Sequence, residues 1–206
     1  MIKEIFKELN QLIFYLKSEE KNKVLDALKL SEIAHSNQLR KSGDPFITHP
    51  IEVAKILTSI KLDGDSIVAG LLHDTLEDTK LGIDEIEKNF GKQISELVQG
   101  LTKISKYSLK ANNQKFGENY KKLILATTKD LRVILIKLAD RLHNMRTISF
   151  VNDNNKKNNV ALETLEVYSP LAQRLGMKEW QDELEDRSFA IINSDARESI
   201  IDRLNY

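Results

Sequence analysis

The chain of 206 residues has no cysteine, only three prolines and eight glycines, and no excess of either charge, since 31 basic residues balance 31 acidic ones. The absence of cysteine excludes disulfides, thiolate nucleophiles, zinc fingers and iron–sulfur clusters. A net charge of zero argues against an extended nucleic-acid-binding surface, which is usually basic. Residues 1–23 lack the uninterrupted apolar core of a signal peptide, and no run of about 18 apolar residues exists, so we expect no membrane span and a cytoplasmic protein.

Apolar residues recur at spacings of three and four along nearly the whole chain, without convincing alternation of period two. This pattern predicts an all-α helical bundle. The expected helices are roughly 2–16, 20–37, 50–60, 64–78, 83–89, 92–103, 117–128, 130–148, 157–175, 177–190 and 195–204. No internal repeat or composition shift marks a boundary, so residues 1–206 are predicted to form a single domain.

Two polar stretches interrupt the helical pattern. Residues 152–159 (NDNNKKNN) are typical of a solvated surface loop. Residues 104–117, which are rich in lysine, are either such a loop or a flap over a binding site.

Ionisable residues crowd the end of the expected helix 64–78. Residues 67–72 are apolar on every side, as in a helix buried in a bundle, and His73, Asp74, Glu77 and Asp78 follow at once. On a continuous helix these side chains share a face. Burying three carboxylates without compensation would cost several kcal/mol, and a divalent cation would remove that cost.

A second apolar run, residues 133–139, also leads into polar side chains. Asp140, Asn144 and Thr147 fall on one stripe of that helix. Asp140 is either a metal ligand or simply a partner for Arg141 or Arg146. His35 and His143 are expected to support a site through hydrogen bonds and not to bind metal.

A third polar segment runs from His35 through Arg40, Lys41 and Ser42 to His49. If the fold brings the three segments together, two histidines and two aspartates give a nitrogen and oxygen donor set suited to Mn²⁺, Fe²⁺ or Zn²⁺.

The order His49, His73-Asp74, Asp140 on an all-α chain resembles the HD phosphohydrolase superfamily. More narrowly, RKSGDPFITHP, LLHDTLEDT, GLTKIS, LIKLADRLHNMRT, ETLEVYSPLAQRLGM and ELEDRSF resemble the hydrolase domain of RelA/SpoT-type alarmone enzymes. The resemblance covers residues from about Asn22 to about Leu204. No synthetase motif or regulatory domain is found, so the chain is expected to be unable to make the alarmone.

The resemblance implies hydrolysis of the 3′-pyrophosphate of guanosine tetra- and pentaphosphate, (p)ppGpp, with one Mn²⁺. The implied metal ligands are His49, His73, Asp74 and Asp140. Glu77 and Asp78 match the pair that positions and deprotonates the attacking water. The implied nucleotide-binding residues are Arg40, Lys41, Ser42, Asn144 and Thr147, with Arg40 against the guanine. Two alternatives stay open: hydrolysis of another 3′-phosphorylated nucleotide, and a regulatory module that binds the alarmone without cleaving it.

Overall fold

The computed structural model describes residues 2–108 and 130–204, with side chains for residues 6–103 and 130–204. Within these stretches every regular element is helical, apart from one isolated bridge between Leu39 and Pro45. The elements are α1 (Ile2–Leu12), α2 (Ser18–Ala34), α3 (Thr48–Ser59), α4 (Gly64–Leu72), α5 (Thr75–Asp78), α6 (Ile83–Phe90), α7 (Lys92–Ser108), α9 (Arg132–Arg146), η1 (Ile148–Phe150), α10 (Asn154–Glu163), the π-helical turn η2 (Thr164–Tyr168), α11 (Ser169–Arg174), α12 (Lys178–Ile192) and α13 (Ser194–Leu204). The all-α prediction is confirmed.

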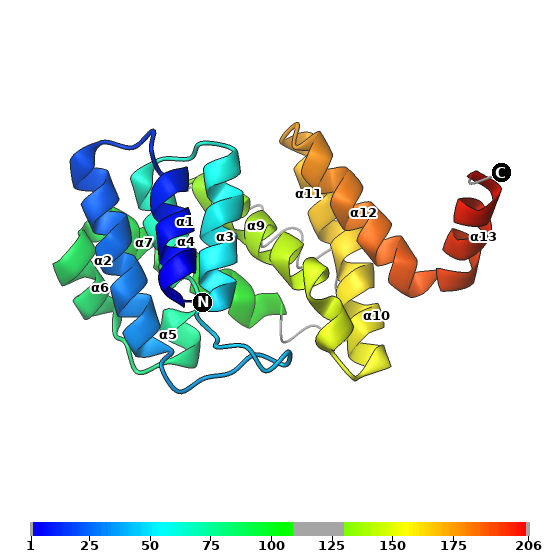
Figure 1. Cartoon of the computed structure of the whole chain (residues 1–206), viewed down its shortest axis with the longest axis horizontal. Helices are drawn as coiled ribbons and strands as arrows, with labels where there is room; N and C mark the ends of the chain where they lie inside the picture. Colours follow the sequence, from blue (N-terminus) through cyan, green and yellow to red (C-terminus); the bar gives the residue numbers. More distant parts are fainter. Residues whose placement is uncertain (1, 109–129, 205–206) are drawn as a thin grey trace.

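The helices form a bundle around α4, with a second group of helices at the far end of α9 (Figure 1). α4 packs against α2, α3, α7 and α9, and α9 continues from the bundle to contact α12. α13 projects at the C-terminal end and buries none of its side chains. None of the described helices is both long and apolar enough to cross a membrane.

α4 is the apolar centre of the bundle. Ile67, Val68, Ala69, Leu71 and Leu72 are completely buried, as the run without a polar face predicts. At the neighbouring glycine, position 70, an added Cβ would lie 2.6 Å from a side-chain carbon of α3, so glycine allows the two helices to approach closely. The residues that follow α4 are therefore carried to the middle of the bundle.

The prediction of one helix over 64–78 is wrong, because α4 ends at Leu72 and the short α5 begins at Thr75. Two side chains hydrogen-bond to backbone carbonyls that would accept backbone N–H groups in a continuous helix. His73 Nδ1 bonds to the Gly70 carbonyl at 2.7 Å, and Thr75 Oγ1 donates to the Leu72 carbonyl at 2.6 Å. Such local bonds to the backbone compete with helical hydrogen bonding. The break changes how His73 and Asp74 are placed relative to α5.

The prediction of a surface loop over 152–159 is also wrong, since α10 begins at Asn154. The Asp153 side chain caps it, accepting from the backbone N–H of Lys156 at 3.1 Å. Only Ala161 of α10 is buried, so the segment has almost no apolar periodicity to reveal a helix. Packing against α12 stabilises it. The expected helix 117–128 and most of 104–117 lie outside the described residues, although α7 extends to Ser108.

Candidate metal centre and adjoining cavity

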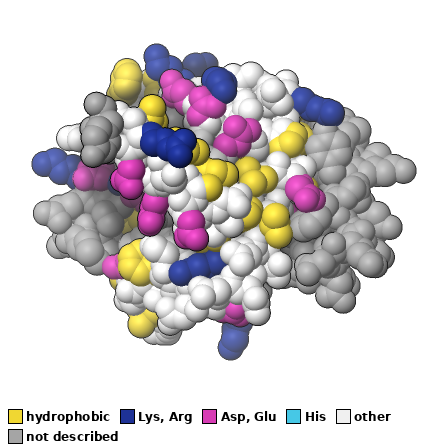
Figure 2. Space-filling model, turned by 90° about the vertical axis from the view of Figure 1, so that its right-hand side faces the viewer, with side chains coloured by type: hydrophobic (Ala, Val, Ile, Leu, Met, Phe, Trp, Pro, Cys, Tyr) yellow, Lys and Arg dark blue, Asp and Glu magenta, His cyan; other side chains and the backbone are white. Residues whose placement is uncertain are grey.

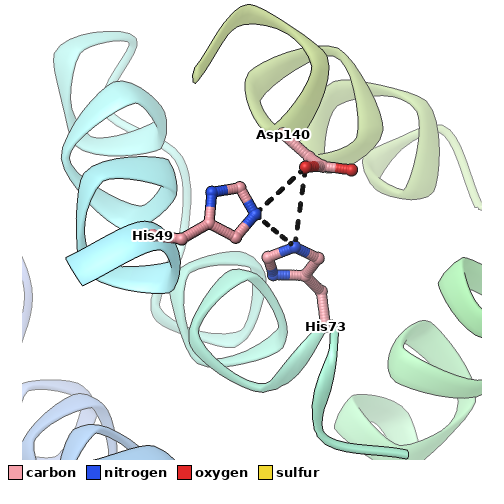
Figure 3. Close-up of side chains that lie close together, drawn as sticks. All are labelled: His49, His73 and Asp140. Atoms are coloured by element: carbon pink, nitrogen blue, oxygen red, sulfur yellow. Dashed lines mark hydrogen bonds and ion pairs between the residues drawn. The ribbon is translucent and has the colours of Figure 1, made fainter. Parts of the chain in front are cut away.

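Three helices bring His49, His73 and Asp140 to one point (Figure 3). His49 lies in the first turn of α3, His73 follows the last residue of α4, and Asp140 lies in the middle of α9. One ligand atom of each residue lies within 4.8 Å of the other two. The His49 Nε2 atom is 3.2 Å from His73 Nε2 and 3.2 Å from Asp140 Oδ1. All three residues are buried, so charge at this point is shielded from water.

The ring nitrogens of the two histidines are oriented by their outer hydrogen bonds. A carbonyl only accepts, so the bond from His73 Nδ1 to the Gly70 carbonyl places a proton on Nδ1, and in the neutral ring Nε2 then keeps its lone pair. His49 Nδ1 lies 2.7 Å from His143 Nδ1. Burial lowers the pKa of His143 to about 3, so its Nδ1 can stay unprotonated and accept the Nδ1 proton of His49. Both inner Nε2 atoms can then act as ligands, the arrangement usual for metal-binding histidines.

Asp74 lies beside this triad. Its two oxygens are 3.2 Å from His73 Nε2 and 3.5 Å from His49 Nε2. Burial disfavours a charged His73, but the carboxylates of Asp74 and Asp140 outweigh burial and raise the pKa of His73 to about 10. The two carboxylates therefore favour a positive charge at this point. A divalent cation supplies that charge as well as a proton on His73 does, and the two imidazole Nε2 atoms and the two carboxylates are suitable ligands for it, so the donor set fits a metal ion.

Lys137 contacts the triad through Asp140, a partner that the sequence reasoning missed. Its Nζ atom lies 2.6 Å from Asp140 Oδ2, and both side chains are buried. Arg141 and Arg146, the two partners considered for Asp140, pair instead with Glu163 and Glu183. The spacing of three between Lys137 and Asp140 on one helix was the available signal. With Oδ2 held by Lys137, Asp140 directs Oδ1 toward the two histidines.

Glu77 and Asp78 stand on α5, next to the triad. The backbone N–H groups of both donate to the Asp74 carbonyl, at 3.1 and 2.9 Å. Burial, with the nearby Asp74 charge, raises the pKa of the Asp78 carboxyl above its ordinary value. The backbone of α5 is thus tied to Asp74, which lies beside the triad.

The predicted nucleotide-binding residues gather around Arg40. Its Nη2 atom lies 3.4 Å from Asn144 Oδ1 and 3.3 Å from Thr147 Oγ1, and its guanidinium lies 5.8 Å from the centre of the Phe46 ring. Asn144 in turn donates to Asp140 Oδ1 at 2.6 Å. Side chains from the α2–α3 loop and from α9 are therefore connected to the triad by hydrogen bonds.

An open cavity of about 780 Å³ joins these groups. Its lining includes the predicted residues Arg40, Lys41, Ser42, His49, Asp74, Asp140, Asn144 and Thr147, whereas His73, Glu77 and Asp78 lie outside the lining. The far wall, from η1 and α10, contributes Phe150 and Lys156, which the sequence reasoning did not select.

All four histidines of the chain are buried, and none is visible on the face at the α13 end, where charges of both signs are interspersed (Figure 2).

Comparison with known proteins gives one family match and several relatives. Residues 27–178 match the model of the HD domain. The chain is 45% identical over 186 residues to the bifunctional (p)ppGpp synthase/hydrolase SpoT of Escherichia coli, covering 90% of this chain and 26% of that protein. It is 48% identical over 170 residues to the GTP pyrophosphokinase rsh of Brucella ovis, covering 82% and 22% respectively. The chain therefore spans about a quarter of the length of these relatives.

A solved structure has the same fold. It is a metazoan ortholog of SpoT described as hydrolysing ppGpp and playing a role in starvation responses. The two superpose with a TM-score of 0.62 at 24% identity, covering 85% of this chain and 96% of the other.

Proposed function

The chain belongs to the HD-domain family, and from this we propose that it hydrolyses the 3′-pyrophosphate of guanosine 3′,5′-bis(diphosphate) and of the pentaphosphate, releasing GDP or GTP with pyrophosphate. One observation carries the proposal: His49 and Asp140, two members of the triad, line the same cavity as the Arg40-Lys41-Ser42 segment. The names of the relatives, which include a guanosine-3′,5′-bis(diphosphate) 3′-pyrophosphohydrolase of Escherichia coli O157:H7, support this choice of substrate.

A divalent cation fits the donor set, and we propose Mn²⁺ held by His49, His73, Asp74 and Asp140. When bound, such an ion polarises phosphoryl oxygens and lowers the pKa of water near it. Nitrogen and oxygen ligands of this kind suit several first-row metals, so the protein's part is to hold the four side chains in place. The bond from His73 to the Gly70 carbonyl and the bond from Lys137 to the Asp140 carboxylate hold two of them without an ion.

The two carboxylates on α5 take the role of proton acceptors. An attacking water must lose a proton, and a carboxylate with a raised pKa accepts it more readily than an ordinary one. The raised pKa of Asp78 supports this role, and Glu77 is its neighbour on the same turn. We assign both to orienting and deprotonating the water.

Arg40 is assigned to the guanosine. A guanidinium is flat and offers both a face for a purine and a fork for phosphate oxygens, which a lysine does not. Arg40 already lies over Phe46 and bonds to Asn144 and Thr147, so its plane is fixed before the nucleotide binds. Lys41 and Ser42, on the same cavity wall, supply a positive charge and a hydroxyl for the phosphates.

Product analysis tests the proposal. The purified protein is incubated with ppGpp or pppGpp, with and without Mn²⁺, and the products are separated by ion exchange. We expect GDP or GTP with an equal amount of pyrophosphate, abolished by chelator. Glu77→Gln should bind Mn²⁺ as the wild type does but lose most turnover. Tight nucleotide binding without turnover would favour a regulatory module. The absence of both turnover and binding would direct the search to other 3′-phosphorylated nucleotides.

A further inference from the structure

The loop between α2 and α3 touches α5 through the side chain of Gln38. Its Nε2 atom donates to the backbone carbonyl of Asp78 at 2.5 Å, joining residues that lie 40 positions apart in the sequence. This loop carries Arg40, and α5 carries Glu77 and Asp78. One hydrogen bond therefore connects the segment assigned to the nucleotide with the segment assigned to the attacking water.

α5 needs such outside support. A helix of four residues is too short to be stable by itself, and the carbonyls of its last turn have no partner within the helix. The chain leaves α5 in an extended conformation at Thr79, so no following helical turn reaches the Asp78 carbonyl. Gln38 supplies the donor that the helix does not.

The direction of the Gln38 amide follows from its partners. The Asp78 carbonyl only accepts, so the NH₂ group of Gln38 faces it and the amide oxygen Oε1 faces away. That oxygen lies 2.7 Å from His35 Nδ1, which must carry a proton in order to donate. His35 is 2% exposed and stacks on Phe46, with ring centroids 4.5 Å apart. The amide is thus held in one orientation by a buried, stacked imidazole.

The other end of this connection reaches Arg40. The Gln38 carbonyl accepts from the Phe46 backbone N–H at 2.9 Å, and Phe46 lies under the Arg40 guanidinium. The Arg40 backbone N–H donates to the Asp44 carbonyl at 2.8 Å, closing the tip of the loop. These contacts connect Arg40 and Phe46 through Gln38 to the end of α5.

We propose that Gln38 is a positioning residue, oriented by His35, that fixes the position of Glu77 and Asp78 relative to the loop that carries Arg40. The proposal rests on the proposed function, which assigns these two carboxylates to the attacking water. Gln38 is itself neither a member of the triad nor one of the described residues that line the cavity. Its loss should therefore affect turnover more than binding.

Two substitutions separate positioning from space filling. Gln38→Met keeps the length of the side chain and removes both hydrogen bonds. Gln38→Glu keeps the shape and an acceptor for His35, but its carboxylate has no donor for the Asp78 carbonyl. We expect both to lower kcat by about ten- to a hundredfold, the scale of a misplacement of about 1 Å, with KM and the affinity for Mn²⁺ changed less than about twofold. Gln93→Met, at an exposed position on α7, is the matched control and should match the wild type.

Hydrogen–deuterium exchange of residues 74–81 provides a readout that needs no substrate. Exchange should quicken there in Gln38→Met and Gln38→Glu but not in Gln93→Met. Unchanged exchange in both would overturn the connection, and faster exchange with wild-type kcat would overturn the positioning role. If both variants behave as the wild type, Gln38 only fills space. If Gln38→Glu does so while Gln38→Met does not, the bond to His35 matters and the bond to the Asp78 carbonyl does not, which also overturns the proposal. Should the wild type itself fail to hydrolyse ppGpp, the proposed function fails, and the exchange measurement still decides whether Gln38 holds α5.

Discussion

Lys137→Met should strongly destabilise the metal-free protein, because it leaves Asp140 as a buried charge without its closest cation. The Lys137 side chain is 11% exposed and that of Asp140 is 8% exposed, and their charged atoms are 2.6 Å apart. Removing one partner of such a pair costs about 3–5 kcal/mol, whereas an exposed pair contributes about 1 kcal/mol or less. For a chain of this size the loss corresponds to a fall in melting temperature of about 6–20 °C.

The matched control is Lys178→Met. Lys178 pairs with Asp182 at 2.5 Å, so the residue type and the contact are similar, but its side chain is 71% exposed. Thermal and urea unfolding in the presence of a chelator should show a large loss for Lys137→Met and no measurable change for Lys178→Met. Equal effects in the two variants would refute the reasoning from burial.

A double variant and a pH series sharpen the test. Lys137→Met combined with Asp140→Leu should recover most of the stability, because replacing both members of a buried pair by apolar groups is often neutral. Burial opposes both charges, but each partner outweighs it: the pKa of Asp140 is lowered and that of Lys137 is raised. The contribution of the pair is therefore complete between about pH 5 and 9, is lost in acid as Asp140 protonates, and is lost in strong base as Lys137 deprotonates.

Three further outcomes are expected. Asp74→Ala should abolish Mn²⁺ binding by calorimetry together with turnover; retained stoichiometry would remove it from the ligands. Arg40→Ala should weaken nucleotide binding by about tenfold or more, because charge-assisted bonds are lost, and nucleotide titration by calorimetry will measure the loss of affinity. Bonds from Arg132 lower the pKa of Asp130, so Asp130→Asn should destabilise at pH 7 and much less at pH 3, by urea unfolding; an equal loss at both would contradict this.

Much of the fold is predictable because burial leaves a local trace in the sequence. A helix buried on all sides must be apolar on all sides, and the run at residues 67–72 has that composition. Polar residues directly after such a run are carried into the core, which singles out His73 and Asp140 as candidates. The helical segment at Asn154 leaves no such trace, since it buries only Ala161, and its polar composition wrongly predicts a loop.

Hydrogen-bond partners, in contrast, were decided by the tertiary structure. The sequence offered Arg141 and Arg146 as partners for Asp140, but both are taken by glutamates at the end of α10 and on α12. Lys137 was then left as the cation that reaches Asp140 in the core.

The same holds for the other contacts that shape the site. The pairing of His49 with His143, the break after Leu72 and the bond from Gln38 to α5 each depend on atoms brought together by packing. By itself the sequence determined the helical class and which side chains enter the core, because the spacing of apolar residues fixes the buried face of each helix. Only the tertiary structure decided which atom faces which, because a hydrogen bond needs its partner within about 3 Å, and that distance is set by segments far apart in the chain.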